Sequence, residues 1–421
     1  MRVVGPSVAA LAAVAAGPFA AGALALRPGW RAGFGERLGG ASAVAGSVWV
    51  HAASVGEVRA ALPLVDELLA RGHAVSFSTQ TLAGRALARS ARSALPCQLA
   101  PLDHPWCVER ALKRRRPTAL VLVESELWPC WIAATDRRGV PVLLVSGRVS
   151  ERSFARYRRL RPLIGRTLRR LKLVGARTPE DAERFRALGA ASASLRVTGD
   201  LKLDDDHQPA PLADDLAAVL GGCSLFVAGS THAGEERAAL VALDAAERSG
   251  AATALVIAPR QLGRVDSLEA VIRKSGRRVR RRSRLGDTPL RCGEVLLLDS
   301  IGELAALYGF ASAAFVGGTL APIGGHNVLE PVVAGTPVLF GPHTRDVEHA
   351  VKILEACGAG RRVADAGELG RVLVEWLADP EGGRDRGARG RSELARHAGS
   401  ARRTAGLVER FAVAGPAGGV A

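Results

Sequence analysis

A carboxylate stands at the end of the first strand that the sequence predicts. The apolar run at 47–53 is followed by Ser54-Val55-Gly56-Glu57 and a helical pattern. In a parallel α/β sheet this turn lies at the carboxyl end of the strand, where such sheets bind ligands, so Glu57 can act as a general base there. Ser54 and Glu57 also have the spacing of a helix capping box, in which the glutamate only satisfies backbone N–H groups. The residues by themselves leave both roles open.

Two further carboxylates follow a second predicted strand, at 119–124. Glu124 and Glu126 stand two residues apart in the stretch ESELWP. A turn of this kind can position a sugar hydroxyl or share an acceptor. The structural alternative is that one carboxylate caps the next helix and the other pairs with one of the many arginines.

Glycine-rich turns occur in the carboxyl-terminal half. The turns at 317–319 (GGT) and 324–327 (GGHN) precede a helical pattern that contains Glu330, and 230–232 (STH) is a hydroxyl-rich turn after another predicted strand. Glycine lets the backbone approach a ligand closely, and the N–H groups at the start of a helix favour a phosphate. Glu330 can accept hydrogen bonds from ribose hydroxyls, so these turns indicate a nucleotide site. Its candidate residues are Ser230, Thr231, His232, Gly318, Gly324, Gly325, His326, Asn327 and Glu330.

Short apolar runs alternate with longer amphipathic stretches from residue 46 onward. Each run is followed by a polar or glycine turn and a helical pattern, which is typical of βα units with a parallel sheet covered on both faces. The sequence therefore predicts an α/β protein. The expected strands are 47–53, 74–79, 119–124, 140–146, 171–176, 194–198, 224–229, 253–258, 294–298, 313–317 and 336–340.

An acidic stretch with two prolines, at 204–214, interrupts the series of strands and indicates a linker. We expect a Rossmann-like domain at 28–203, a second one at 215–378 and a helical tail at 379–421. Two doubly wound domains of this kind would face a cleft at the carboxyl ends of their sheets.

The amino-terminal segment carries no charge over the 24 residues 3–26. As a helix it would extend about 36 Å, enough to cross a bilayer core. A signal peptide, a signal anchor and a buried helix are the three alternatives. A cleaved signal has its positive charge before the apolar run, whereas here one arginine precedes the run and three follow it within 27–37. The positive-inside rule then favours an anchor at 1–27 with the remainder on the cytoplasmic side.

Composition and charge restrict the partners. The 421 residues include 57 Lys or Arg and 41 Asp or Glu, a net charge of +16, so nucleic acid, anionic lipid and phosphorylated substrates are candidates. Aromatic residues make up only 4% of the chain, which disfavours a single-stranded nucleic-acid platform. A P-loop ATPase is excluded because no G-x-x-x-x-G-K-[ST] occurs. A classical dehydrogenase is disfavoured because no G-x-G-x-x-G follows the first strand.

The six cysteines show no C-x-x-C pair and no Cys/His spacing of a zinc site. We therefore expect neither structural zinc nor a disulfide framework, and a reducing compartment fits best.

Two stretches concentrate positive charge. Residues 152–172 contain nine Lys or Arg and no acid, with apolar residues at helical spacing and an interruption at Pro162. This pattern is typical of a helix that binds a membrane surface or a partner, although the apolar stripe can also be core packing. The run at 273–284 is predicted to be a solvated loop.

Taken together, these segments resemble the 3-deoxy-D-manno-octulosonic acid (Kdo) transferases, glycosyltransferases of the GT-B fold. The resemblance extends from about residue 27 to about 360. It depends on many short matches in the order of the family: 28–30 (PGW), 36–39 (ERLG), 51–57 (HAASVGE), 124–129 (ESELWP), 147–150 (GRVS), 198–202 (TGDLK), 230–236 (STHAGEE), 259–260 (PR), 307–309 (LYG) and 317–331.

The resemblance implies transfer of Kdo from CMP-Kdo to a hydroxyl of a lipid A precursor, with inversion and release of CMP, in lipopolysaccharide assembly. It implies an anchor in the inner membrane. With the catalytic domains on the cytoplasmic face, as the positive-inside rule predicts, and with the arginine-rich stretch at 152–172, we expect an anionic membrane surface as a partner and no nucleic acid. It also implies that no metal and no cofactor is needed.

The resemblance assigns roles to individual residues. Glu57 corresponds to the general base. The acceptor or sugar would contact Ser54, Gly56, Glu124, Glu126 and Arg148. The CMP-Kdo donor would contact Lys202, Ser230, Thr231, His232, Arg260, Gly318, Gly324, Gly325, His326, Asn327 and Glu330.

Two departures from the family pattern bear on the donor. The family's Pro-Arg-His-Pro-Glu-Arg is PRQLGR at 259–264, so Gln261 stands where a histidine is usual. Asp200 occupies a position that is more often serine. Its carboxylate would either weaken donor binding or pair with Lys202.

Two other functions remain as alternatives. One is a GT-B enzyme with a soluble acceptor, or a nucleotide-sugar epimerase, which leaves the basic helix and the uncharged segment unexplained. The other is a non-catalytic basic protein that binds membranes or nucleic acid, which leaves the glutamates and the glycine loop without a role.

Overall fold

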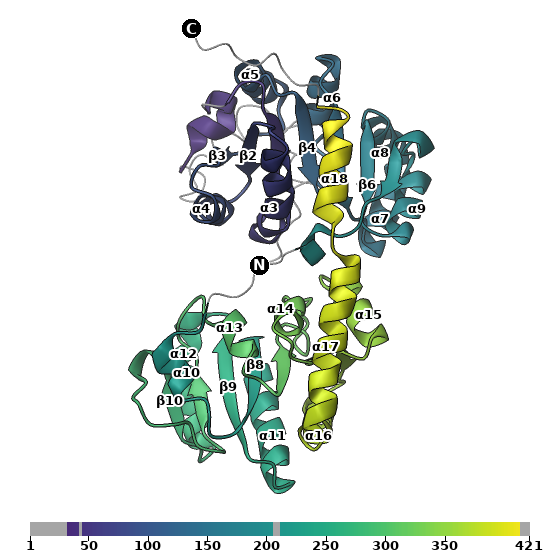
Figure 1. Cartoon of the computed structure of the whole chain (residues 1–421). Helices are drawn as coiled ribbons and strands as arrows, with labels where there is room; N and C mark the ends of the chain where they lie inside the picture. Colours follow the sequence, from purple (N-terminus) through teal and green to yellow (C-terminus); the bar gives the residue numbers. More distant parts are fainter. Residues whose placement is uncertain (1–31, 42–43, 205–210, 413–421) are drawn as a thin grey trace. The chain divides into compact units, whose positions relative to one another are not determined.

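The computed structural model describes residues 32–41, 44–204 and 211–412 (Figure 1). The described residues form two compact units, unit 1 with residues 32–41, 44–204 and 397–412, and unit 2 with residues 211–396. Each unit has one seven-stranded sheet, and every strand pair in both sheets is parallel. The predicted α/β class with two parallel sheets is confirmed.

The sheet of unit 1 has the order β3-β2-β1-β4-β5-β6-β7. Its strands are β1 (Val48–His51), β2 (Val75–Thr79), β3 (Cys97–Leu99), β4 (Ala119–Val123), β5 (Val142–Gly147), β6 (Leu173–Ala176) and β7 (Leu195–Val197). The helical elements are η1 (Glu36–Gly40), α3 (Val55–Ala70), α4 (Leu82–Ala91), α5 (Pro105–Arg115), α6 (Pro129–Arg137), α7 (Glu151–Arg159), α8 (Arg161–Leu168), α9 (Pro179–Leu188), η2 (Ser192–Ser194), η3 (Leu201–Asp204) and α18 (Ser400–Glu409).

The sheet of unit 2 has the order β10-β11-β9-β8-β12-β13-β14. Its strands are β8 (Ser224–Thr231), β9 (Thr253–Pro259), β10 (Val279–Arg281), β11 (Val295–Leu297), β12 (Ala313–Val316), β13 (Val338–Phe340) and β14 (Gly360–Arg362). The helical elements are α10 (Asp214–Ala218), α11 (Glu235–Arg248), η4 (Leu262–Arg264), α12 (Val265–Lys274), η5 (Arg282–Arg284), α13 (Leu304–Tyr308), α14 (Leu329–Val333), α15 (Glu348–Ala356), α16 (Ala366–Leu377) and α17 (Pro380–His397).

Helices cover both faces of the unit 1 sheet, which explains why its central strands are buried along their whole length and are mostly apolar. Successive residues of a strand point to opposite faces. Val48 and Val50 of β1 accordingly belong to one buried cluster, and Trp49 between them belongs to another. All five residues of β4 are buried. The continuous apolar runs of the sequence therefore indicated the central strands correctly.

The end of the chain returns to unit 1. Within the segment 379–421, α17 belongs almost entirely to unit 2, whereas α18 packs beside α3 (Figure 1). Ala401, Ala405 and Val408 of α18 are buried in the same cluster as α3. The Asp204 carboxylate accepts a hydrogen bond from the backbone N–H of Ala401, which ties the start of α18 to η3.

Two expectations from the sequence are wrong. Cys223 and Cys292 form a disulfide with a Cα–Cα distance of 5.7 Å, and a separation of 69 residues gave no local spacing to reveal it. The run at 273–284 is not simply a solvated loop, because it contains β10, which pairs with β11. Arg281 of β10 binds Asp266 and Glu269, so its charge is neutralised at the edge of the sheet.

The expected anchor at 1–27 lies outside the described residues, as does 205–210 of the expected linker. Among residues 32–41, 44–204 and 211–412, no helix has the length and apolar character that a bilayer crossing requires.

Removing α18 should destabilise unit 1. A chain ending at residue 398 should lose at least about 3 kcal/mol of unfolding free energy in that unit, because the apolar face of α3 and the partners of Val408 become exposed. Hydrogen exchange of α3 peptides measures this loss. A chain ending at residue 412 keeps α18 and should behave as the full chain does, while α11 in unit 2 should be unaffected in both. Equal α3 protection in the two truncations would contradict the role of α18.

Candidate functional site

Each sheet reverses its strand order at one position, and the candidate residues collect at these two positions. In unit 1 the chain moves outward from β1 to β2 and β3 on one side, then from β4 to β7 on the other. In unit 2 the reversal lies between β8 and β12. At such a reversal the two following loops turn to opposite faces, which leaves a crevice at the carboxyl ends of the strands.

Glu57 lies at the carboxyl end of β1, on the first turn of α3. Its backbone N–H donates to Ser54 Oγ at 3.3 Å, and Ser54 Oγ donates to Glu57 Oε1 at 3.0 Å. Glu57 Oε2 accepts from the backbone N–H of Ala53 at 2.7 Å. The capping box predicted from the sequence is therefore present, and both carboxylate oxygens are engaged in it.

The surroundings of Glu57 favour its neutral form. Burial raises the pKa of Glu57 from an ordinary 4.5 to about 8, with the charges of Glu126 and then Glu124 as further causes. The hydrogen bonds from Ala53 and Ser54 oppose this rise. A carboxylate whose only task was capping would gain from ionisation, so the crowding of three carboxylates indicates more than a capping role.

Glu124 and Glu126 are both buried, and they have different partners. Glu126 Oε2 accepts from Trp128 Nε1 at 2.6 Å and lies 3.7 Å from His51 Nε2. Glu124 Oε1 lies 2.5 Å from Lys202 Nζ of η3. Glu124 also has a φ of 62°, a left-handed conformation that is strained for glutamate and is often found at functional sites. Neither residue caps α6, whose N-cap is Trp128.

Lys202 and Asp200 belong to unit 1 and face different groups. The Asp200 carboxylate binds Arg177 at 3.1 Å and accepts from the backbone N–H of Lys202 at 3.1 Å. The ammonium group of Lys202 is paired with Glu124 instead. Of the two alternatives for Asp200, pairing with Lys202 is found only at the backbone N–H, because Arg177 supplies the counter-charge to the carboxylate.

Two other predicted residues of unit 1 border this edge of the sheet. Arg148 directly follows β5 and is half-buried. A Cβ at Gly56 would contact only Ser54 Oγ, at 4.0 Å, so this glycine leaves open space at the start of α3.

In unit 2 two histidines meet at the strand reversal. His232 follows β8, His326 follows β12, and their Nε2 atoms are 2.8 Å apart with the rings stacked at 5.0 Å. Burial lowers the pKa of His326 to about 4, and the nearby charges of Arg260 and His232 lower it further. His326 is therefore neutral at pH 7, and Arg260, which is exposed, supplies the positive charge beside it.

The glycines of this site allow conformations that other residues resist. Gly318, Gly324 and Gly325 have φ values of 71°, 123° and 94°. A Cβ at Gly325 would lie 2.6 Å from a methyl group of Val347. The loop ends at Asn327, which accepts from the N–H of Leu329 at 3.1 Å and donates to Glu330 at 3.2 Å.

Ser230 and Thr231 lie in the last part of β8, which continues beyond the predicted end at 229. Ser230 has a left-handed φ of 54°, and Thr231 is buried, with Oγ1 donating to Glu236 at 3.2 Å. Glu236 also binds Arg264 at 2.7 Å. Gln261, between Arg260 and Arg264, is exposed.

The sequence reasoning did not assign a role to Glu235 or Glu236. Both are buried at the start of α11, where the stretch STHAGEE offered a signal: two acidic residues at a helix start directly after a strand. Glu236 holds Arg264 and Thr231, and Glu235 binds the backbone of the glycine loop. In the part of the chain that the structure describes, no group of three or more His, Cys, Asp or Glu side chains is arranged to hold a metal ion.

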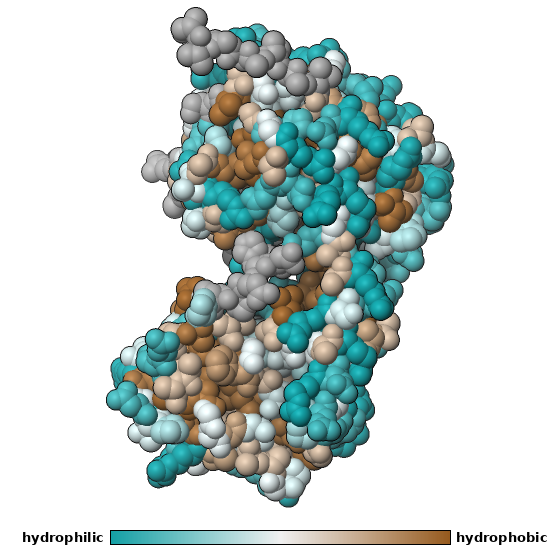
Figure 2. All heavy atoms as spheres, viewed as in Figure 1, coloured by the Kyte–Doolittle hydropathy of each residue, from teal (hydrophilic) through white to brown (hydrophobic). Residues whose placement is uncertain are grey.

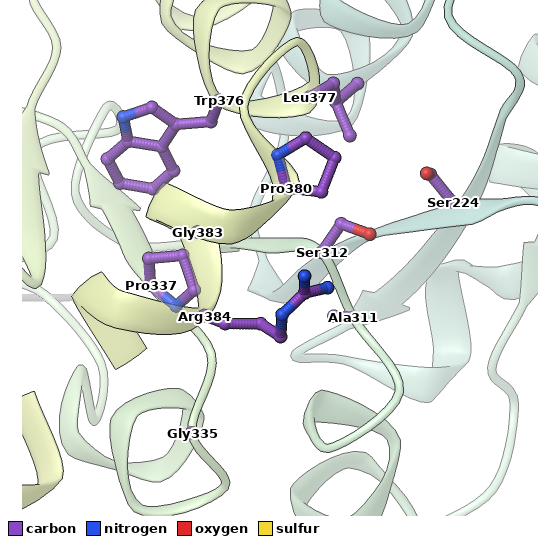
Figure 3. Close-up of a pocket in the computed structure, with 10 residues that line it drawn as sticks. All are labelled: Ser224, Ala311, Ser312, Gly335, Pro337, Trp376, Leu377, Pro380, Gly383 and Arg384. Atoms are coloured by element: carbon purple, nitrogen blue, oxygen red, sulfur yellow. The ribbon is translucent and has the colours of Figure 1, made fainter. Parts of the chain in front are cut away.

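A pocket of about 150 Å³ also occurs in unit 2, but at the other edge of the sheet (Figure 3). Ser224 begins β8, while Ser312 and Pro337 immediately precede β12 and β13, so the pocket lies at the amino ends of these strands. Trp376 and Arg384 complete its wall. It is therefore separate from the loops at the carboxyl ends.

Comparison with known proteins identifies relatives over most of the chain. Residues 31–205 match the sequence model of the 3-deoxy-D-manno-octulosonic-acid transferase (kdotransferase) family. The chain is 36% identical to the 3-deoxy-D-manno-octulosonic acid transferase of Bordetella pertussis, over 87% of each chain. It is 31% identical to the Aquifex aeolicus enzyme of the same name, over 79% of this chain and 86% of that one.

Solved structures show a similar fold at low sequence identity. A putative UDP-N-acetylglucosamine 2-epimerase from Listeria monocytogenes is 13% identical, with a TM-score of 0.61 over 87% of this chain and 96% of that one. MurG from Acinetobacter baumannii is 15% identical, with a TM-score of 0.52 over 86% and 99%. These likenesses concern the fold alone: two parallel α/β sheets in one chain, as in the GT-B glycosyltransferases.

The raised pKa of Glu57 should be measurable by carboxyl NMR titration. Because the folded pKa lies above the unfolded one, the folded chain binds more protons between pH 4.5 and about 8. The contribution of Glu57 to stability should therefore be present below about pH 4.5 and be lost as the pH rises through about 8.

Glu126→Gln should lower the pKa of Glu57 more than Glu124→Gln, because Glu126 is the stronger charge effect. Glu109→Gln, on α5 and paired with Arg138, is the control and should leave it unchanged. If Glu57 titrates near pH 4.5 in the unaltered chain, then burial and the nearby carboxylates do not raise its pKa, and this description of the site is wrong.

Proposed function

We propose the following reaction for this chain, which belongs to the 3-deoxy-D-manno-octulosonic acid (Kdo) transferase family. The chain transfers Kdo in lipopolysaccharide biosynthesis; the donor is CMP-Kdo and the acceptor is a hydroxyl group of a lipid A precursor. The catalytic assignment depends on one observation. Glu57 lies at the strand reversal of unit 1, where burial and the nearby carboxylates Glu126 and Glu124 raise its pKa to about 8.

Unit 1 supplies the base. The attacking hydroxyl must lose its proton as it bonds to the ketosidic carbon of Kdo, and the ionised form of Glu57 accepts that proton. The raised pKa makes this form a stronger base than an ordinary carboxylate, and it also lowers the ionised fraction at pH 7, so transfer should rise with pH toward about 8. Glu124 and Glu126 then orient the acceptor or sugar hydroxyls. Lys202 limits the repulsion among the three carboxylates by neutralising Glu124.

Unit 2 supplies the donor site. As the bond to CMP breaks, negative charge grows on the leaving phosphate while the sugar gains oxocarbenium character. In this proposal Arg260 and the loop at 324–327 stabilise that phosphate, because fixed charges and backbone dipoles require no reorganisation during the reaction. Asn327 and Glu330, which are hydrogen-bonded to each other, hold the nucleoside. The hydrogen bond between the two Nε2 atoms uses the N–H of one ring, so the ring that accepts it can donate from Nδ1 to the phosphate.

Glu57→Ala should abolish transfer and leave CMP binding within about twofold of the unaltered chain, because the base acts on the acceptor. Incubation with CMP-Kdo and a tetra-acylated lipid A precursor, followed by mass spectrometry of the lipid, detects each added Kdo. The matched control is Glu67→Ala at the other end of α3, which should retain transfer. Transfer by Glu57→Ala at a rate near the unaltered one would show that Glu57 is only a cap.

The arginine-rich part of unit 1 supports a lipid acceptor and an anionic membrane surface. The expected single helix is two, α7 and α8, and Tyr157, Leu168 and Leu171 of its apolar stripe are buried in the core. Leu160 and Leu163 are 42% and 40% exposed. Figure 2 shows hydrophilic residues with scattered apolar ones over this part. The exposed arginines are Arg152, Arg156, Arg158, Arg159, Arg161, Arg166 and Arg169.

This face would rest on the cytoplasmic side of the inner membrane, together with an anchor in residues 1–27. Replacing Arg158, Arg159 and Arg161 by Gln should weaken binding to vesicles with anionic lipid by roughly 100-fold, at about 1 kcal/mol for each charge near the surface. Replacing Arg371, Arg384 and Arg396 of unit 2 by Gln removes the same charge and should change binding much less. Vesicle flotation measures both, and equal losses would refute a specific face.

A further inference from the structure

Glu235 is a buried carboxylate whose hydrogen-bond donors are backbone groups. It is the first residue of α11 and is 1% exposed. Its Oε2 atom accepts from the N–H of His232 at 2.8 Å and of Gly318 at 2.7 Å. Its Oε1 atom accepts from the N–H groups of the three residues 319–321 at 2.9–3.0 Å. Four successive residues after β12 thus direct their N–H groups at one carboxylate.

Successive backbone N–H groups that converge in this way form an anion-binding concavity, of the type that proteins use for phosphate. The positive end of the α11 dipole adds to its attraction for an anion. In this chain the protein's own carboxylate fills the concavity. The N–H of Gly318, a predicted donor contact, is therefore already engaged.

The packing around the carboxylate requires a close approach. A Cβ at Gly317 would lie 2.4 Å from the Ser230 carbonyl oxygen and 2.7 Å from Glu235 Oε2, so only glycine fits. The Thr319 hydroxyl accepts from the N–H of Gly341 at 2.8 Å, which fixes the loop to the end of β13.

The position of residues 318–321 determines that of the next turn. The N–H groups of Gly324 and Gly325 both donate to the Gly318 carbonyl, at 3.1 and 2.8 Å. The N–H of His326 donates to the carbonyl of Gly317 at 3.2 Å. Because the backbone of His232 is bound to the same carboxylate, both members of the histidine pair are positioned through Glu235.

We propose that Glu235 is a positioning residue for the donor site: it occupies the N–H concavity at 318–321 and thereby directs the donor phosphate to the 324–327 loop and the histidine pair. This inference depends on the proposed donor site in unit 2. It follows that removal of the carboxylate leaves an empty anion site, which a small carboxylate from solution can refill.

The test uses the full chain with Glu235→Ala, CMP and formate. Glu235→Ala should weaken CMP binding at least tenfold by calorimetry, and about 50 mM formate should restore most of that loss. Hydrogen exchange of peptides covering 318–326 should rise in the variant and fall again with formate. A role in stability alone would change the unfolding midpoint without any response to formate.

Glu269→Ala is the matched control. Glu269 is also buried in unit 2, on α12, but its partners are the side chains of Arg273 and Arg281. It should bind CMP as the unaltered chain does, with or without formate. Glu235→Gln keeps the shape of the side chain and replaces one acceptor oxygen by a donor. It should lose less CMP affinity than Glu235→Ala. If Glu235→Ala does not fold, the CMP affinity of Glu235→Gln tests the proposal instead.

Unchanged CMP affinity in a folded Glu235 variant, or a loss that formate does not restore, would overturn the proposal. The proposed function can fail separately. If the unaltered chain binds neither CMP nor CMP-Kdo, yet formate restores exchange protection at 318–326 in Glu235→Ala, the donor assignment is wrong and the positioning role of Glu235 stands.

Discussion

The parallel pairing of β1 with β4, and of β8 with β12, is the constraint on which both candidate sites depend. At each pair the strand order reverses, so the loops that follow the two strands diverge and leave their side chains room at the same edge. Glu57 and Glu124 reach one such edge from β1 and β4. His232 and His326 reach the other from β8 and β12. Residues far apart in the chain are thus brought together by backbone hydrogen bonding rather than by their own attraction.

Two glutamates at helix starts illustrate how the surroundings set the role of a carboxylate. Glu57 lies in the first turn of α3, where burial and then the charges of Glu126 and Glu124 raise its pKa to about 8. Glu235 begins α11, where five backbone N–H groups converge on its oxygens. In our proposals the first glutamate exchanges a proton with the acceptor, and the second fixes the position of a loop. The local sequences, SVGE and HAGE, are nearly alike, and the difference arises from the neighbouring strands.

The neighbouring elements also determine which cation neutralises each buried acid. Lys202 neutralises Glu124 while Arg177 neutralises Asp200, so two buried acids on neighbouring elements each have a separate cation. Such pairing is costly to break, because an isolated buried charge is left behind. It explains how this chain accommodates an aspartate at position 200.

The sequence by itself determined the central strands, because strands that are buried on both faces, such as β4, are mostly apolar along their length. It also determined the family and the residues that follow the strands, since the short motifs at the strand ends occur in the order that is specific to the family. It did not reveal β3, β10 and β14, which are three-residue strands at sheet edges, although β7, of the same length and also at an edge, was predicted. Only the tertiary structure decided three other features, because each joins groups whose proximity depends on strand order and not on spacing along the chain. They are the Cys223–Cys292 disulfide, the Arg177–Asp200 ion pair and the binding of Glu235 in the N–H concavity at 318–321.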